Sequence, residues 1–274
     1  DGSGYQVAKT QPMKLAAMEG YYEGREGAGL VAVGLLNPDK EKYNDGKDPF
    51  IFRVEIPQML SLLAKRELNA FVPGVKDIIE GGYVQKDGTV ALSAAEKIER
   101  GKKAIAALAS YRSAKKEGNT ATADSAYVTL QENMAYFGYG YIKDVHHLVP
   151  NVPITFYAFR IMVMLGFYFI LFFAVVLFLV YKDKLAEMKW MHWIALLTIP
   201  LGYIAAEAGW VVAECGRQPW AIQDLLPTSA SVSRVSVGSV QLTFYIFLVL
   251  FTVMLIAEVG IMLREIKKGP ELNK

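Results

Sequence analysis

Three long runs without a charged side chain constrain the fold of this sequence more than any other feature. They lie in the second half of the chain and contain 20, 17 and 23 residues: Ile161–Val180, Trp190–Ala206 and Val235–Ala257. A helix needs about 20 residues to cross the hydrocarbon core of a bilayer. The sequence therefore predicts an all-α membrane protein with three transmembrane helices.

The remaining composition excludes several other classes. Hydrophobic residues make up 53% of the 274 positions, and the net charge is +2 with Lys and Arg scattered along the chain. A charge this small and dispersed does not indicate a nucleic-acid partner. The single cysteine, Cys215, excludes an internal disulfide and a CxxC site.

Residues 1–152 are predicted to form a largely helical domain that precedes the membrane region 153–274. Ser93 and Glu96 have capping-box spacing, and the apolar pattern that follows ends near Gly118. Turn-rich loops are predicted at "LLNPDKEKYNDGKDP" and "VQKDGTV". Two further helices are predicted, at Thr122–Phe137 and at Pro57–Leu68.

The distribution of basic residues predicts the orientation in the membrane. The loop "YKDKLAEMK" and the C-terminal tail are rich in Lys and Arg, whereas the loop between the second and third runs has only Arg217 and Arg234. Basic loops stay on the cytoplasmic side. The C-terminus is therefore expected in the cytoplasm and residues 1–152 on the outer face.

Two carboxylates and a guanidinium fall near the end of the second apolar run. Glu207 and Glu214 are seven residues apart, which places them on one helical face roughly 10 Å apart, and Arg217 continues that face. Charges at membrane depth are costly and mark functional sites by default. The residues alone leave two interpretations open, a cofactor site and a polar patch that faces a partner subunit.

Several motifs carry a resemblance to a known family. "GRQPW" after "EAGWVVAE", "FRIMVMLGF" at 159–167 and "KLAAMEG" at 14–20 occur in this order. They resemble subunit I of the cytochrome bd quinol oxidases, specifically its C-terminal half: the quinol-binding loop and the last three transmembrane helices. Because the chain begins at Asp1 without Met or a signal peptide, we expect a split or cleaved polypeptide.

The resemblance assigns roles to the polar residues of the second membrane helix. It implies that Glu214 is a ligand of a high-spin haem and that Glu207 is a proton donor or a support for that site. Arg217 is implied to neutralise haem propionates, and Trp210 to lie among the haems. Without the motif, Glu214 reads as an interfacial carboxylate and Glu207 as a hydrogen-bonding group between helices.

The "FRIM" segment supplies the implied ligand of the low-spin haem. By position within the motif, Met162 is the axial ligand, and Arg160 is placed to pair with a propionate. A methionine on an apolar helix is more often core filling, and Met164 is a nearby competitor.

In the quinol loop, the resemblance implies that Lys14 and Glu19 act on the quinol. A carboxylate is needed to accept a proton from a ring hydroxyl, and a cation to stabilise the developing oxygen charge. The two are five residues apart and do not stack on an ideal helix; the other interpretation is two solvated loop charges. The histidines match no ligand position, and a surface metal site at His146 and His147 is a weak alternative.

Together these features imply part of a quinol:oxygen oxidoreductase in a bacterial inner membrane, crossing it several times. The expected cofactors are a low-spin haem b, a high-spin haem b, and haem d or a further haem b. The expected partners are the N-terminal half as a separate chain, subunit II, a small single-helix subunit, membrane lipid and quinol. The alternative is a haem-free membrane anchor that docks a respiratory partner.

Overall fold

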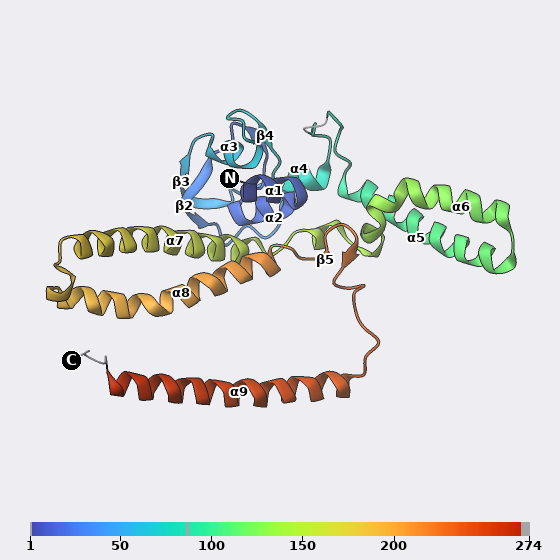
Figure 1. Ribbon diagram of the computed structural model, residues 1–274. Helices are drawn as coiled ribbons and strands as arrows, with labels where there is room; N and C mark the ends of the chain where they lie inside the picture. The colour runs from blue at the N-terminus through green and yellow to red at the C-terminus, as the bar shows by residue number, and fades with distance from the viewer. Residues whose placement is uncertain (1, 86–87, 270–274) are drawn as a thin grey trace. The chain divides into compact units, whose positions relative to one another are not determined.

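The computed structural model describes residues 2–85 and 88–269 (Figure 1). The chain divides into two compact units, which separate between Ser231 and Val232. The second unit is dominated by one helix, α9 (Val237–Lys268). The predicted boundary after residue 152 separates the loop domain from the membrane region, and it does not coincide with the boundary between the compact units. It stays a prediction.

Three helices are long and apolar enough to cross a membrane, as predicted. They are α7 (Val152–Tyr181), α8 (Lys189–Cys215) and α9. Each is longer than its uncharged run, and polar side chains cap the starts of α7 and α9. The Asn151 side chain accepts a hydrogen bond from the Ile154 N–H at the start of α7, and Ser236 caps α9 in the same way. Since α8 continues to Cys215, Glu207 and Glu214 both lie within a membrane helix.

Helices α7 and α8 form an antiparallel pair, connected by a short 3₁₀ turn, η3 (Leu185–Glu187) (Figure 1). One hydrogen bond joins them at membrane depth, with 2.6 Å between the Tyr168 and Thr198 hydroxyl oxygens. The Thr198 hydroxyl already donates to the Ile194 carbonyl, so the Tyr168 hydroxyl is the donor between the helices. Such a bond fixes the register of the pair because no water competes for it.

The region before α7 is largely helical, with small sheets that the sequence interpretation did not include. Strands β2 (Leu30–Leu36) and β3 (Phe50–Ile56) pair antiparallel. Their β-branched and aromatic side chains suit a pleated strand, and the predicted turn-rich loop connects them. The short elements of this region are α1 (Gly2–Thr10), α2 (Pro12–Glu19), β1 (Arg25–Glu26), α3 (Met59–Lys65), β4 (Phe71–Val72) and α4 (Val75–Glu80).

A helical hairpin, α5 (Ala94–Glu117) and α6 (Thr120–Asn133), follows (Figure 1). The predicted capping box is confirmed, since the Ser93 hydroxyl accepts from the Glu96 N–H and the Glu96 carboxylate accepts from the Ser93 N–H. The prediction of one helix through Phe137 was wrong. From Met134 the chain tightens into a 3₁₀ helix, η1 (Met134–Tyr141).

Close backbone contact accounts for the glycines of η1. A Cβ on Gly101 of α5 would lie 2.3 Å from the Gly140 nitrogen, so the two backbones touch and leave no room for side chains. A further 3₁₀ turn, η2 (Val145–Leu148), leads to α7.

The main hydrophobic cluster joins this region to the membrane helices. Leu15 of α2 and Leu60 of α3 share it with Ala158 of α7 and Val212 of α8. Burial of these apolar side chains fixes α2 against the end of the helix pair at which α7 begins and α8 ends.

Candidate functional site

Helix α2 carries the "KLAAMEG" motif and is the element that organises the candidate site. Proline in its first turn suits a helix start. Gly20 ends the helix with φ of 62°, a left-handed conformation that favours glycine. Ala16 and Ala17 are 2% and 0% exposed, so α2 approaches its neighbours closely. The charged residues at its two ends are thereby directed towards α7 and α8.

At the C-terminal end of α2, Glu19 forms a buried ion pair with Arg160 of α7. The distance from Glu19 Oε2 to Arg160 Nη2 is 2.6 Å, and the side chains are 2% and 9% exposed. The guanidinium also lies over the rings of Phe156 and Phe159, at 4.7 and 5.2 Å. A pair this enclosed is sensitive to loss of either partner, because the remaining charge would stay buried.

Burial and ion pairing act on Glu19 in opposite directions. Burial disfavours the carboxylate and raises the pKa of Glu19, while the charge and hydrogen bond of Arg160 lower it; burial has the larger effect, so the pKa is raised. The Nε atom of Arg160 is buried and has no hydrogen-bond partner among the described residues. This donor is therefore unsatisfied within the part of the chain that the structure describes.

At the other end of α2, Lys14 lies next to the end of α8. A Cβ on Gly216 would lie 3.0 Å from Lys14 Cγ. Burial lowers the pKa of Lys14, Arg217 lowers it further and Glu214 raises it. Glu214 and Arg217 form an ion pair of 2.5 Å across one helical turn. In the described residues, Arg217 Nε is also buried without a hydrogen-bond partner.

Lys14 and Glu19 therefore face two different charge clusters. Glu19 contacts α7 through Arg160, whereas Lys14 approaches Glu214 and Arg217 of α8. The sequence spacing already argued against a shared face on a regular helix. The sequence did not indicate that Arg160 pairs with Glu19 of the "KLAAMEG" motif, since Arg160 was expected to pair with a haem propionate.

The structure distinguishes the two methionines of the "FRIM" helix. A Cβ on Gly209 would lie 3.1 Å from Met162 Sδ, so the Met162 sulfur packs closely against α8 beside Gly209. Met164 is 61% exposed and lies on another face. The two methionines therefore have different surroundings, and Met162 as the haem ligand stays a prediction.

The other predicted residues of α8 are not enclosed. Glu207 is exposed, and Trp210 is 63% exposed. Among the described residues, no group of three or more His, Cys, Asp or Glu side chains is placed to hold a metal ion. His146 instead packs beside the Tyr43 ring, 5.3 Å between centroids.

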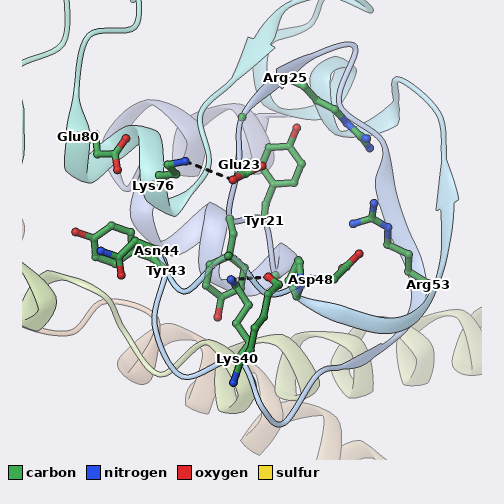
Figure 2. A pocket seen from close by; sticks show the side chains of 16 residues that line it. Tyr21, Glu23, Arg25, Lys40, Tyr43, Asn44, Asp48, Arg53, Lys76 and Glu80 are labelled. Atoms are coloured by element: carbon green, nitrogen blue, oxygen red, sulfur yellow. Dashed lines mark hydrogen bonds and ion pairs between the residues drawn. The ribbon is translucent and has the colours of Figure 1, made fainter.

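A cavity of about 710 Å³ begins directly after Glu19, at Gly20 (Figure 2). Cationic side chains surround it, and four of them have acidic partners, whereas the Lys47 ammonium donates to the Asp39 backbone carbonyl. Lys76 lies 3.5 Å from Glu23, and Lys40 lies 2.7 Å from Asp45. Arg25 and Arg53 both pair with Glu55. Neither Lys14 nor Glu19 lines this cavity.

A second polar cluster was missed by the sequence reasoning. The Tyr139 hydroxyl of η1 donates to Asp224, with 2.6 Å between the oxygens, and the Tyr139 ring packs on Trp220 at 4.8 Å between centroids. Lys97 of α5 lies over the same ring. Contacts between positions 85 residues apart carry no local sequence signal.

Known proteins resemble this chain over nearly its whole length. It is 32% identical to the cytochrome bd-II ubiquinol oxidase subunit 1 of Escherichia coli over 98% of this chain and 51% of that protein. It is 28% identical to the cytochrome bd ubiquinol oxidase subunit 1 of Bacillus subtilis over 97% of this chain and 43% of that protein. The chain thus spans about half the length of these curated relatives.

Structure and family comparisons agree. The bd oxidase structure from Geobacillus thermodenitrificans has a similar fold, with a TM-score of 0.57, 24% identity, and coverage of 98% of this chain and 44% of that one. The family model for cytochrome bd terminal oxidase subunit I matches residues 1–270. The chain belongs to the cytochrome bd terminal oxidase subunit I family.

Proposed function

We propose that this chain is the quinol-loop and C-terminal membrane part of a bd-type oxidase that oxidises quinol and reduces oxygen to water. The buried Glu19–Arg160 pair carries the proposal, because it joins the "KLAAMEG" motif directly to the "FRIM" helix. A proton-accepting carboxylate thereby lies beside the segment proposed to hold the low-spin haem. The ubiquinol oxidases among the relatives support the same reaction class.

The donor set fits haem groups shared with other chains. Met162 offers a thioether sulfur, a known type of ligand for haem iron. Glu214 offers a carboxylate, a type of ligand that suits hard metal centres. The two buried arginine Nε atoms without partners suit propionate groups. When bound, the haems accept electrons from quinol and supply the site for oxygen reduction. Low-spin haem b, high-spin haem b and haem d, or a further haem b, are the proposed set.

Glu19 handles a proton in this proposal. Oxidation of a quinol releases two protons with its two electrons, and a carboxylate whose pKa is raised by burial holds a proton closer to neutral pH than an exposed one. Protonation of Glu19 neutralises the carboxylate that balances the charge of Arg160. The unbalanced guanidinium favours release of the proton to the next acceptor, and this release restores the ion pair. Lys14 contributes positive potential at the α8 end of the motif.

The uncovered surfaces fit a larger assembly. Glu207, Trp210 and the apolar side chains of α9 are exposed, and we propose that the N-terminal half of subunit I, as a separate chain, subunit II and a small single-helix subunit cover them together with lipid. Following the basic loops, residues 1–152 lie outside and the C-terminus lies in the cytoplasm of a bacterial inner membrane.

Replacing Glu19 with Gln should reduce quinol-driven oxygen uptake by at least about a hundredfold, as for loss of a general base. Uptake driven by an artificial donor that bypasses the loop should change much less. Both rates are measured on the purified complex with an oxygen electrode.

Two further variants separate catalysis from folding. Glu23→Gln removes an exposed carboxylate that pairs with Lys76 and should leave both rates unchanged. Glu19→Gln with Arg160→Gln removes the whole buried pair, so no uncompensated charge remains. If quinol-driven uptake returned in this double variant, Glu19 would be structural rather than a proton acceptor.

A further inference from the structure

A cavity of about 430 Å³ lies beside the start of α7. Its walls include Lys42 of the loop between β2 and β3, His146 of η2 and Pro153 in the first turn of α7. The hairpin that follows α8, made of β5 (Trp220–Ile222) and β6 (Leu226–Pro227), does not contribute to it. The cavity therefore lies where the region before α7 meets the first membrane helix.

The length of α7 places this cavity at the level of lipid headgroups. The helix has 30 residues, and a helix of that length is about 45 Å long. The hydrocarbon core of a bilayer is about 30 Å thick, or about 40–45 Å with both headgroup regions. When α7 spans the membrane, its two ends therefore reach the two headgroup layers. Its first turn, and the cavity beside it, lie in one of them.

An apolar strip leads from the cavity into the membrane. Ile154, Tyr157 and Ile161 of α7 are all exposed, and their spacing of three and four residues places them on one helical face. Pro153, which lines the cavity, directly precedes this strip. Tyrosine is common at the depth where a helix leaves the hydrocarbon core. The strip thus offers a path for an acyl chain whose headgroup lies in the cavity.

The polar lining carries one unpaired charge of each sign. The Glu41 carboxylate and the Lys42 ammonium form no ion pair or hydrogen bond with another described residue. Their backbone N–H groups donate to Asp45 Oδ2, at 3.1 and 3.2 Å, which fixes the loop that presents them. Lys40, by contrast, is bound to Asp45 at 2.7 Å. The cavity therefore presents an anion and a cation that are adjacent in the chain.

His146 adds a hydrogen-bond donor. Its ring packs beside Tyr43, with 5.3 Å between the centroids, and its side chain forms no hydrogen bond with another described residue. A neutral imidazole carries one N–H donor, and a charged imidazole carries two. Lys42 and His146 line the same cavity, so together they provide donors for one phosphate group.

These properties select a zwitterionic headgroup. A phosphate accepts from Lys42 and His146, and a primary ammonium donates to Glu41. A purely anionic headgroup would bring its charge towards Glu41 without a compensating bond, and a choline headgroup has no N–H to donate. Phosphatidylethanolamine meets both requirements. The volume of the cavity also falls within the range of about 300–1,000 Å³ for small-molecule sites.

We propose that the cavity lined by Glu41, Lys42 and His146 binds the headgroup of phosphatidylethanolamine, with an acyl chain along the strip that begins at Ile154. The site is separate from Glu19, which does not line the cavity. The bound lipid connects the loop between β2 and β3 to the start of α7. The inference requires that α7 spans a membrane, but it does not require the oxidation of quinol.

Native mass spectrometry of the delipidated complex, titrated with phosphatidylethanolamine in detergent micelles, tests the site. Lys42→Met and His146→Leu should each weaken binding of one phosphatidylethanolamine by about tenfold, the effect of losing one hydrogen bond to a charged group. Phosphatidylglycerol, which has no amine, should bind the parent complex about tenfold more weakly than phosphatidylethanolamine. Glu41→Gln should abolish this preference, because it removes the carboxylate that discriminates between the two headgroups.

Lys143→Met and His147→Leu are the matched controls, because both residues are exposed, lie close to His146 in the sequence and do not line the cavity. Both variants should bind phosphatidylethanolamine as the parent does. Parent-like affinity in both Lys42→Met and His146→Leu would overturn the proposal. Equal affinity of the parent complex for the two lipids would overturn it as well.

A photoreactive benzophenone side chain in place of Ile154 identifies what covers the strip. In the complex extracted with its native lipids, we expect adducts with the mass of phosphatidylethanolamine. The same side chain at Lys102, an exposed position on α5, is the control and should give no lipid adduct. Adducts of position 154 with a polypeptide alone would show that a partner subunit covers this face, and the lipid site would then be refuted.

Discussion

Replacing Glu214 with Ala is expected to remove or displace one high-spin haem and to abolish oxygen reduction. Groups that only orient a metal ligand typically contribute about 10–100-fold to affinity or activity, so loss of the ligand itself should lower oxygen uptake by at least about a hundredfold. Haem quantification, absorption spectra and oxygen uptake of the purified complex measure the effect.

Glu214→Ala also removes the ion pair with Arg217. A second substitution at position 214 is therefore needed to separate that loss from the loss of the ligand. Glu214→Gln keeps an oxygen that accepts from Arg217 at the contact now 2.5 Å long, yet removes the anionic ligand. Haem loss in both variants is the result expected for ligation. Full haem occupancy with a native spectrum in Glu214→Ala would refute the assignment.

Glu207 provides the contrast on the same helix. It lies two turns from Glu214 on a regular helix, about 10 Å away, and therefore cannot bind the same iron atom. Glu207→Ala should slow turnover with little change in haem content.

Replacing Met162 with Leu is expected to convert the low-spin haem to a high-spin form or to remove it. Leucine keeps most of the side-chain volume but has no sulfur. Because methionine ligation raises the reduction potential, any haem that remains should have a lower potential. Absorption spectra of the reduced complex and a redox titration measure both changes.

Met164→Leu is the matched control, since Met164 is 61% exposed and does not share the Gly209 contact. It should retain the native spectrum and potential. The reverse outcome, in which only Met164→Leu changes the haem, would show that the motif is aligned at the wrong methionine.

The sequence was sufficient for the features that depend on local patterns. The three apolar runs became α7, α8 and α9, and the Ser93 capping box starts α5. The hairpin of β2 and β3 was missed because its strands show no clean alternation of buried and exposed positions, and the turn-rich loop between them dominated the interpretation. The change from α6 to η1 was missed because it depends on the approach of Gly101 to Gly140, which no local pattern records.

The candidate site was also predictable only where local sequence patterns define it. Motifs identified the individual residues, but not which of them meet. The Glu19–Arg160 pair joins positions 141 residues apart, and the Tyr139–Asp224 bond forms only when η1 docks on the hairpin after α8. Such pairings result from tertiary packing, so the sequence alone predicted the residue types without their contacts.

A pyridine haemochrome spectrum of the purified complex tests the central claim, that this chain forms part of a haem-containing quinol oxidase, most directly. We predict haem b bands, with haem quantities that fall in Met162→Leu or Glu214→Ala relative to the parent complex. A complex that contains this chain and its partner subunits but shows no haem spectrum would contradict the claim and support a haem-free membrane anchor.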